Sequence, residues 1–293
     1  MSELLFDTEF LAQLEQLRIN YRTRAFGQSG GGRRSRMHGM SAEFSDFREY
    51  QLGDDFRRID WNAFARFEKL VMKLFLEEKQ MRINFLIDQS ASMSYFGKDI
   101  MAKRLALAMS YLALNGYDQV RVVPLGDENE REIGSLTGKN SFMRLMDYLQ
   151  NMQPQKLSPL NEAITNIDFK SGSGICYLLT DAFSQDGENA DDAISGIENA
   201  LAYLRYQKQE TTLIHILAPQ ELNPKYEGEV RLIDSETGES REVEVNGSLL
   251  RLYEESLKTF CAKLKENCHK YGFQYELIPA DMDLRKAILE NII

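Results

Sequence analysis

The sequence predicts an α/β protein built on a doubly wound, mostly parallel sheet with helices on both faces. Two observations carry this prediction. Strand-like and helix-like segments alternate from residue 82 to the end of the chain at the spacing of βαβ units. The 293 residues are 43% hydrophobic and 27% charged, which suits a large globular domain with an appendage and excludes disorder and collagen. We therefore expect a folded, soluble protein.

The chain opens with a segment whose apolar residues recur at helical spacing. Intervals of four, four and three residues predict a short amphipathic helix, and Asp7 stands where its N-cap is expected. The apolar face of this helix consists of Phe6, Phe10, Leu14 and Leu17.

A basic, glycine-rich stretch follows at 22–36. It has five arginines and no acidic residue, which predicts a flexible basic loop. Over 70–77 every second residue is a leucine or methionine, and this period of two predicts an edge strand. Residues 1–80 are expected to form an N-terminal extension, and 81–293 the main domain.

The main domain begins with a strand at 82–87, which ends at Asp88. Period-2 and period-3.6 patterns then alternate along the chain. The further expected elements are helices at 98–115, 141–152, 159–167, 191–207, 249–271 and 282–293, and strands at 119–125, 174–180, 211–218 and 273–278.

One stretch, 229–245, interrupts this alternation. Alternating valines flank a turn-forming segment that ends at Gly238, which predicts an inserted β-hairpin.

Composition also limits the functions to consider. No apolar run approaches the roughly 18 residues of a membrane span, the N-terminus has no secretory pattern, and three cysteines cannot all pair, so we expect a cytoplasmic protein without a transmembrane segment. The formal net charge is −10, and all of it arises after residue 80. Nucleic-acid binding depends on neutralising phosphates, so nucleic acid is not an expected partner.

Polar residues that follow strands are the candidates for chemistry, because ligands of a doubly wound sheet bind beyond the carboxyl ends of its strands. Asp88, Ser90 and Ser92 follow the first strand, and Asp181 follows the strand at 174–180. Ser158 precedes another helix. Carboxylate and hydroxyl oxygens suit a hard cation such as Mg²⁺.

This pattern resembles the metal-ion-dependent adhesion site of von Willebrand factor A domains. The resemblance implies a metal set for Mg²⁺ or Mn²⁺ and a protein partner whose acidic side chain completes the metal shell. It also implies a von Willebrand factor A-like fold for 81–293. The implied set is Asp88, Ser90, Ser92, Ser158 and Asp181, and Thr165 is an alternative to Ser158.

A second resemblance covers almost the whole chain. The run 48–61, the pairs at 43–44 and 65–66, and the segment 234–238 are similar to the family known as domain of unknown function fifty-eight. That resemblance implies that the protein acts as an accessory of a MoxR-type AAA+ ATPase in the assembly or maturation of a protein complex.

Simpler interpretations stand beside these. Asp88 and the two serines could cap the following helix, and the charged residues of 48–66 could form structural ion pairs. His215 lies within a strand, where a buried, hydrogen-bonded histidine is expected. The charged residues of 48–66 in question are Arg48, Asp54, Arg57, Asp60 and Arg66.

No complete enzyme motif is present, so we expect a non-enzymatic, cation-dependent protein-interaction module. The segment at 134–141 resembles a phosphate loop but has too few residues between its glycines, and no Gly-x-Ser-x-Gly elbow occurs. Two alternatives stay open. One is a metal-dependent hydrolase that uses Asp88 and Asp181, and the other is nucleic-acid binding through the loop 22–36.

Overall fold

The computed structural model divides the chain into two compact units. Unit 1 comprises Met1–Arg34 and Met81–Ile293, and unit 2 comprises Ser35–Gln80. Within them the structure describes residues 6–27, 44–51, 54–56, 59–75, 80–126, 132–154, 159–169, 172–183, 190–235 and 238–292.

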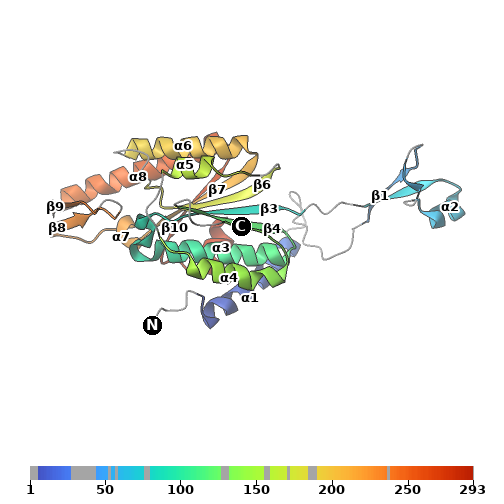
Figure 1. Ribbon diagram of the computed structural model, residues 1–293, viewed down its shortest axis with the longest axis horizontal. Coiled ribbons are helices and arrows are strands. Elements are labelled where there is room, and N and C mark those ends of the chain that lie inside the picture. Colours follow the sequence, from blue (N-terminus) through green and yellow to red (C-terminus); the bar gives the residue numbers. More distant parts are fainter. Residues whose placement is uncertain are drawn as a thin grey trace. The chain divides into compact units, whose positions relative to one another are not determined.

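Unit 1 is built on a six-stranded sheet, in the order β10-β7-β6-β3-β4-β5 (Figure 1). All neighbouring strands are parallel except β5, which pairs antiparallel with β4 at the edge. The order of connections reverses between β3 and β6, so the carboxyl ends of these two strands flank the switch point of a doubly wound sheet. The strands are β3 (Arg82–Asp88), β4 (Gln119–Leu125), β5 (Ile133–Leu136), β6 (Gly174–Thr180), β7 (Gln209–Leu217) and β10 (Gln274–Pro279).

Helices cover both faces of this sheet (Figure 1), as predicted. Side chains alternate along β3, so Phe85 and Ile87 enter one hydrophobic core and Leu86 the other. The first core includes α1 (Thr8–Gly27), α3 (Lys98–Asn115), α4 (Phe142–Asn151), α9 (Leu284–Lys286) and the π-helical turn Ala287–Ile292. The second includes α5 (Leu160–Thr165), α6 (Ala190–Tyr206) and α8 (Gly247–Lys270).

The predicted opening helix forms and is longer than expected. The Phe10 backbone N–H donates to Asp7 Oδ1 at 2.7 Å, which confirms the N-cap, and the four apolar residues of its face are buried. Because α1 continues to Gly27, the prediction of a flexible loop is wrong for 22–27, while 28–36 lie outside the described residues. Contacts place this helix with unit 1, so the expected extension 1–80 contains parts of both units.

The predicted hairpin is present and consists of β8 (Gly228–Ile233) and β9 (Ser240–Val245), which pair antiparallel. A short helix that sequence patterns do not predict, α7 (Pro219–Leu222), precedes it. Of the predicted closing helix 282–293, only Leu284–Lys286 is α-helical, and the described residues after it form the π-helical turn.

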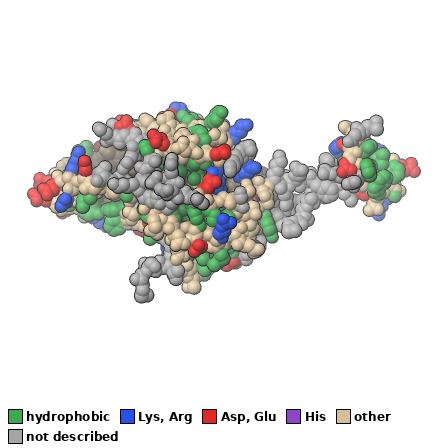
Figure 2. Space-filling model, in the orientation of Figure 1, with side chains coloured by type: hydrophobic (Ala, Val, Ile, Leu, Met, Phe, Trp, Pro, Cys, Tyr) green, Lys and Arg blue, Asp and Glu red, His purple; other side chains and the backbone are tan. Residues whose placement is uncertain are grey.

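Unit 2 contains β1 (Phe44–Glu49), β2 (Val71–Phe75) and α2 (Trp61–Phe67). The two strands pair antiparallel, and Asp60 caps α2 by accepting the backbone N–H groups of Asn62 and Ala63. Of the charged residues that the structural interpretation groups, Arg48 and Asp54 form an ion pair at 2.7 Å, and Arg57 lies outside the described residues. Figure 2 shows apolar side chains gathered on the surface of this unit.

No helix in the described part of the chain combines the length and the apolar character that crossing a bilayer requires.

Candidate functional site

The candidate site lies where β3 and β6 end side by side. Asp88 is the last residue of β3, and Asp181 directly follows β6. The strand-end argument therefore predicted the meeting of these two carboxylates, which are both buried. Between Asp88 and α3 the chain forms the 3₁₀ segment Ala91–Gly97.

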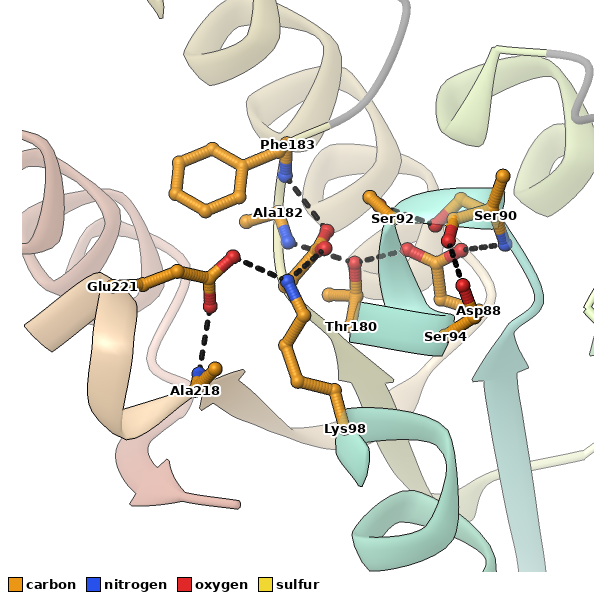
Figure 3. A network of polar contacts seen from close by, with 12 residues as sticks. Asp88, Ser90, Ser92, Ser94, Lys98, Thr180, Ala182, Phe183, Ala218 and Glu221 are labelled. Carbon is orange, nitrogen blue, oxygen red and sulfur yellow. Dashed lines mark hydrogen bonds and ion pairs between the residues drawn. The ribbon is translucent and has the colours of Figure 1, made fainter. Parts of the chain in front are cut away.

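Local hydrogen bonds hold the Asp88 loop in place (Figure 3). Asp88 Oδ1 accepts the Ser90 backbone N–H at 2.8 Å, and Asp88 Oδ2 accepts the Thr180 hydroxyl. The hydroxyl oxygens of Ser90 and Ser92 lie 2.9 Å from each other. Ser90 precedes the 3₁₀ segment without capping it through its side chain, so the simple capping interpretation does not describe this serine.

The serine pair fits a small divalent cation. Two adjacent oxygens of an octahedral Mg²⁺ shell, each about 2.1 Å from the metal, are about 3 Å apart. The 2.9 Å between the two hydroxyl oxygens is the length of the hydrogen bond that joins them, and it is also compatible with this separation. In the described part of the chain no three His, Cys, Asp or Glu side chains form a metal-holding group.

A buried lysine occupies the other side of Asp181. Lys98 Nζ donates to Glu221 Oε1 at 2.6 Å (Figure 3) and to Asp181 Oδ2 at 2.8 Å. The Lys98 and Asp181 side chains are fully buried. The Phe183 backbone N–H donates to the second Asp181 oxygen at 3.1 Å. We refer to Lys98, Asp181 and Glu221 as the ion triad.

Glu221 reaches the triad from α7. Its second oxygen accepts the Ala218 backbone N–H at 2.6 Å, so the carboxylate also caps its own helix. Neither Lys98 nor Glu221 was among the site residues predicted from the sequence. A local signal existed only for Glu221, because Pro219 followed by a glutamate at the third helical position is typical of a helix start.

The electrostatics follow from this burial. Burial and the nearby charge of Asp181 raise the pKa of Asp88 to about 7, against the hydrogen bonds from Thr180 and Ser90. Burial alone would lower the pKa of Lys98, but Asp181 and Glu221 more than offset it, and the Lys98 pKa is raised. Burial raises the pKa of Glu221 despite the opposing charge of Lys98. The ammonium thus stays charged and neutralises part of the site.

Two hydroxyls, those of Ser158 and Thr165, were the candidates predicted to complete the metal set. Ser158 lies outside the described residues. The alternative, Thr165, is exposed, and its hydroxyl donates to the Asn161 carbonyl of its own helix. The structure also brings the hydroxyl of Thr180, which is fully buried, to Asp88.

Exposed aromatic side chains lie beside the ion triad. Lys98 Nζ lies 5.9 Å from the centroid of the Tyr95 ring and 5.7 Å from that of the Phe183 ring. The Tyr95 ring also packs edge-on against Phe96. The Tyr95 hydroxyl lies 3.3 Å from that of Tyr226, and the Tyr253 hydroxyl donates to the Glu221 carbonyl. We call these five residues the aromatic rim.

Two residues in the loops of the site have a strained backbone. Phe96 has a φ of 43° and Ala182 a φ of 59°, both in the left-handed region that side chains with a Cβ avoid. Such strain persists only where surrounding contacts hold it, and it is frequent at binding sites.

His215 lies behind the site and is fully buried, as predicted. Its Nε2 lies 2.9 Å from the Asp181 carbonyl oxygen and its Nδ1 lies 2.8 Å from the Tyr275 hydroxyl. Both ring nitrogens are therefore engaged, and this imidazole is not placed to act as a general base at the strand ends.

Comparison with known proteins gives one broad match and several distant ones. Residues 46–259 match the model of a family described as Protein of unknown function DUF58. The chain is similar to Uncharacterized protein Rv1480 of Mycobacterium tuberculosis and Uncharacterized protein Mb1516 of Mycobacterium bovis, each 22% identical over 254 residues, which cover 83% of this chain and 76% of the relative.

Two solved structures are also similar. One is the conserved hypothetical protein BatB from Bacteroides thetaiotaomicron, with 14% identity, a TM-score of 0.38, and coverage of 71% of this chain and 95% of that chain. The other is an aerotolerance-related membrane protein from Bacteroides fragilis, with 14% identity, a TM-score of 0.41, and coverage of 72% and 98%. At these TM-scores the similarity carries no argument about function.

Proposed function

Because the chain belongs to the DUF58 family of proteins of unknown function, we propose its function from the site itself: a non-enzymatic, divalent-cation-dependent protein-interaction module with a von Willebrand factor A-like main domain. The observation that carries the proposal is the convergence of Asp88, Asp181 and the Ser90–Ser92 hydroxyl pair at the switch point of the sheet.

In this proposal the serines and the aspartates have different roles in binding Mg²⁺ or Mn²⁺. Ser90 and Ser92 offer the two hydroxyl oxygens at octahedral spacing, and Asp88 and Asp181 supply the negative charge around them. Ser158 remains the proposed further hydroxyl. When bound, the cation would link this chain to a carboxylate of a protein partner.

Lys98 explains why a partner carboxylate would matter. Its ammonium stands 2.8 Å from Asp181, so it both occupies one carboxylate oxygen and adds a positive charge beside the cation. Each effect weakens cation binding by the isolated chain. An acidic side chain from a partner would restore the missing negative charge, so cation and partner should bind cooperatively.

The aromatic rim is the proposed source of specificity. Tyrosine is frequent among the residues that dominate interface energies, and phenylalanine is enriched at interface cores. Tyr95, Phe183 and Tyr226 are each exposed; Tyr95 and Phe183 lie beside Lys98 of the ion triad, and Tyr226 lies beside Tyr95. By family resemblance we propose a MoxR-type AAA+ ATPase, or a complex that it assembles, as the partner.

Calorimetry tests this function. Mn²⁺ and Mg²⁺ are titrated into the purified chain with and without acetate, which stands in for the partner carboxylate. We expect binding that strengthens with acetate and disappears in Asp88→Ala and Ser92→Ala. Ser94→Ala is the matched control, because the Ser94 hydroxyl donates to the Ala91 carbonyl rather than to the serine pair. Binding that survives Asp88→Ala, or no binding with acetate present, would refute the proposal.

The partner is tested separately. The chain is immobilised, and the purified ATPase is passed over it in Mg²⁺ and then in EDTA. Capture that EDTA and Asp88→Ala both abolish supports the partner, whereas capture indifferent to both removes the cation from the mechanism.

A further inference from the structure

Most side chains of the hairpin β8–β9 are exposed, and Val230, Val243 and Val245 are half-buried. No residue of either strand is fully buried, and Leu232 and Ile233 near its tip are 55% and 66% exposed. A two-stranded hairpin without further packing is only marginally stable in water. An exposed ribbon that retains aliphatic side chains therefore suggests a surface that another chain covers.

The register separates the hairpin into two unlike faces. Gly228 pairs with Val245, Val230 with Val243, and Leu232 with Arg241. Because side chains alternate along a strand, these positions share one face, which is mainly aliphatic. The other face carries the pairs Glu229–Glu244, Arg231–Glu242 and Ile233–Ser240.

The second face has uncompensated negative charge. Glu229 lies directly opposite Glu244, a like-charge pair that destabilises a hairpin, and in the described residues neither carboxylate has a hydrogen bond or ion pair. Between 228 and 245 the sequence has six acidic residues and two arginines. Figure 2 shows acidic side chains at this end of unit 1. A basic partner would remove the repulsion.

The backbone offers a way to bind such a partner. Among the described residues β8 and β9 pair only with each other, so the outer edge of each strand carries N–H and C=O groups without a strand beside them. An exposed edge of this kind accepts an extended peptide as a further strand.

We propose that the β8–β9 hairpin is a docking arm that takes up an extended, basic segment of a protein partner as a third strand. Lysine or arginine at alternate positions would lie on the same face as Glu229 and Glu244, and the aliphatic residues between them would lie on the face of Val230, Leu232 and Val243. This surface does not depend on the cation site, so either proposal can fail without the other.

The base of the hairpin is continuous with the aromatic rim. Tyr226, two residues before β8, has its hydroxyl beside that of Tyr95, and α7 holds Glu221 against Lys98. One partner could therefore contact both surfaces, with a basic strand on the arm and an acidic residue at the strand ends.

The test uses a fluorescein-labelled peptide that alternates lysine and valine over seven residues, with fluorescence anisotropy as the readout. The matched peptide alternates glutamate and valine. Two further peptides carry N-methyl groups on either all lysines or all valines, since N–H groups of alternate residues point to opposite edges of a strand. We expect the lysine peptide to bind, the glutamate peptide not to bind, and one N-methylated peptide to lose binding while the other retains it.

Protein variants locate the binding site. Glu229→Gln together with Glu244→Gln should weaken binding of the lysine peptide about fivefold, because two exposed charge contacts are lost. Glu254→Gln with Glu255→Gln, on the exposed surface of α8, is the control and should change nothing.

Three outcomes would overturn the proposal. Absence of lysine-peptide binding removes the basic partner, and equal binding by both N-methylated peptides shows charge attraction without strand pairing. Sedimentation that reveals a dimer of this chain dissociated by Leu232→Asp would assign the arm to a second copy instead.

Discussion

Replacing Lys98 with Met is the most informative perturbation of the ion triad. Methionine keeps most of the apolar stem but removes the ammonium, so Asp181 loses a partner at 2.8 Å and Glu221 one at 2.6 Å. Removing one member of a buried ion pair typically costs about 3–5 kcal/mol. The Glu221 side chain is 17% exposed and Asp181 keeps the Phe183 N–H, so we expect a loss near the lower end, about 3 kcal/mol.

Urea unfolding followed by far-UV circular dichroism measures this loss, first in EDTA and then with Mg²⁺. In the variant the Asp181 oxygen is released and the competing positive charge is gone, so Mg²⁺ should bind more tightly than in the wild type. If Kd falls to a hundredth of the Mg²⁺ concentration, the cation restores about 2.7 kcal/mol of unfolding free energy.

Lys103→Met is the matched control. Lys103 is also nearly buried in α3, but it pairs with Asp99 and the Met152 carbonyl, away from the strand ends. We expect it to be destabilised without any specific response to Mg²⁺. A loss below about 1 kcal/mol in Lys98→Met, or an equal Mg²⁺ response in both variants, would refute the account of the triad.

Three further predictions follow from other contacts. Glu221→Gln keeps an acceptor for the Ala218 N–H and leaves Lys98 paired with Asp181. Urea unfolding should therefore show a smaller loss of unfolding free energy than in Lys98→Met, about 1.5 kcal/mol. An equal loss in the two variants would contradict this prediction. Gly174→Ala places a Cβ within 2.8 Å of the Arg82 carbonyl oxygen. The same assay should therefore show a loss of about 1–3 kcal/mol in unfolding free energy. An unchanged urea midpoint would show that β3 and β6 can move apart without cost. Burial raises the pKa of Asp118, so its ionised form weakens the folded state as pH rises above the ordinary carboxyl range. Asp118→Asn should therefore gain stability relative to wild type between pH 4 and pH 7, and a constant difference across this pH range in parallel unfolding curves would contradict the sign.

Local sequence patterns were sufficient for the long elements of unit 1. The helix Lys98–Asn115 and the strands Gln119–Leu125 and Gly174–Thr180 have the bounds that periodicity predicts. These segments are long or fully apolar on their buried sides, so burial imposes a clear period on the sequence.

The missed elements lack such a period. The strand β5 has four residues, which are too few to show a period, and α2 has no buried residue, so its sequence records no buried face. The strand β1 lies in a stretch that mixes aromatic and charged residues and is recognisable through its pairing with β2.

The candidate site was likewise predictable from the sequence in one part and not in another. The meeting of Asp88 and Asp181 follows from the chain alone, because both residues come after parallel strands and the carboxyl ends of such strands share one edge. The position of Lys98 between Asp181 and Glu221, in contrast, arises from the packing of the folded chain. Lys98 is 83 residues from Asp181 and 123 from Glu221, so the contact depends on how three separate crossovers pack against the sheet. No local period encodes that contact, because a buried ion pair is selected by partners in space and not by neighbours in the chain.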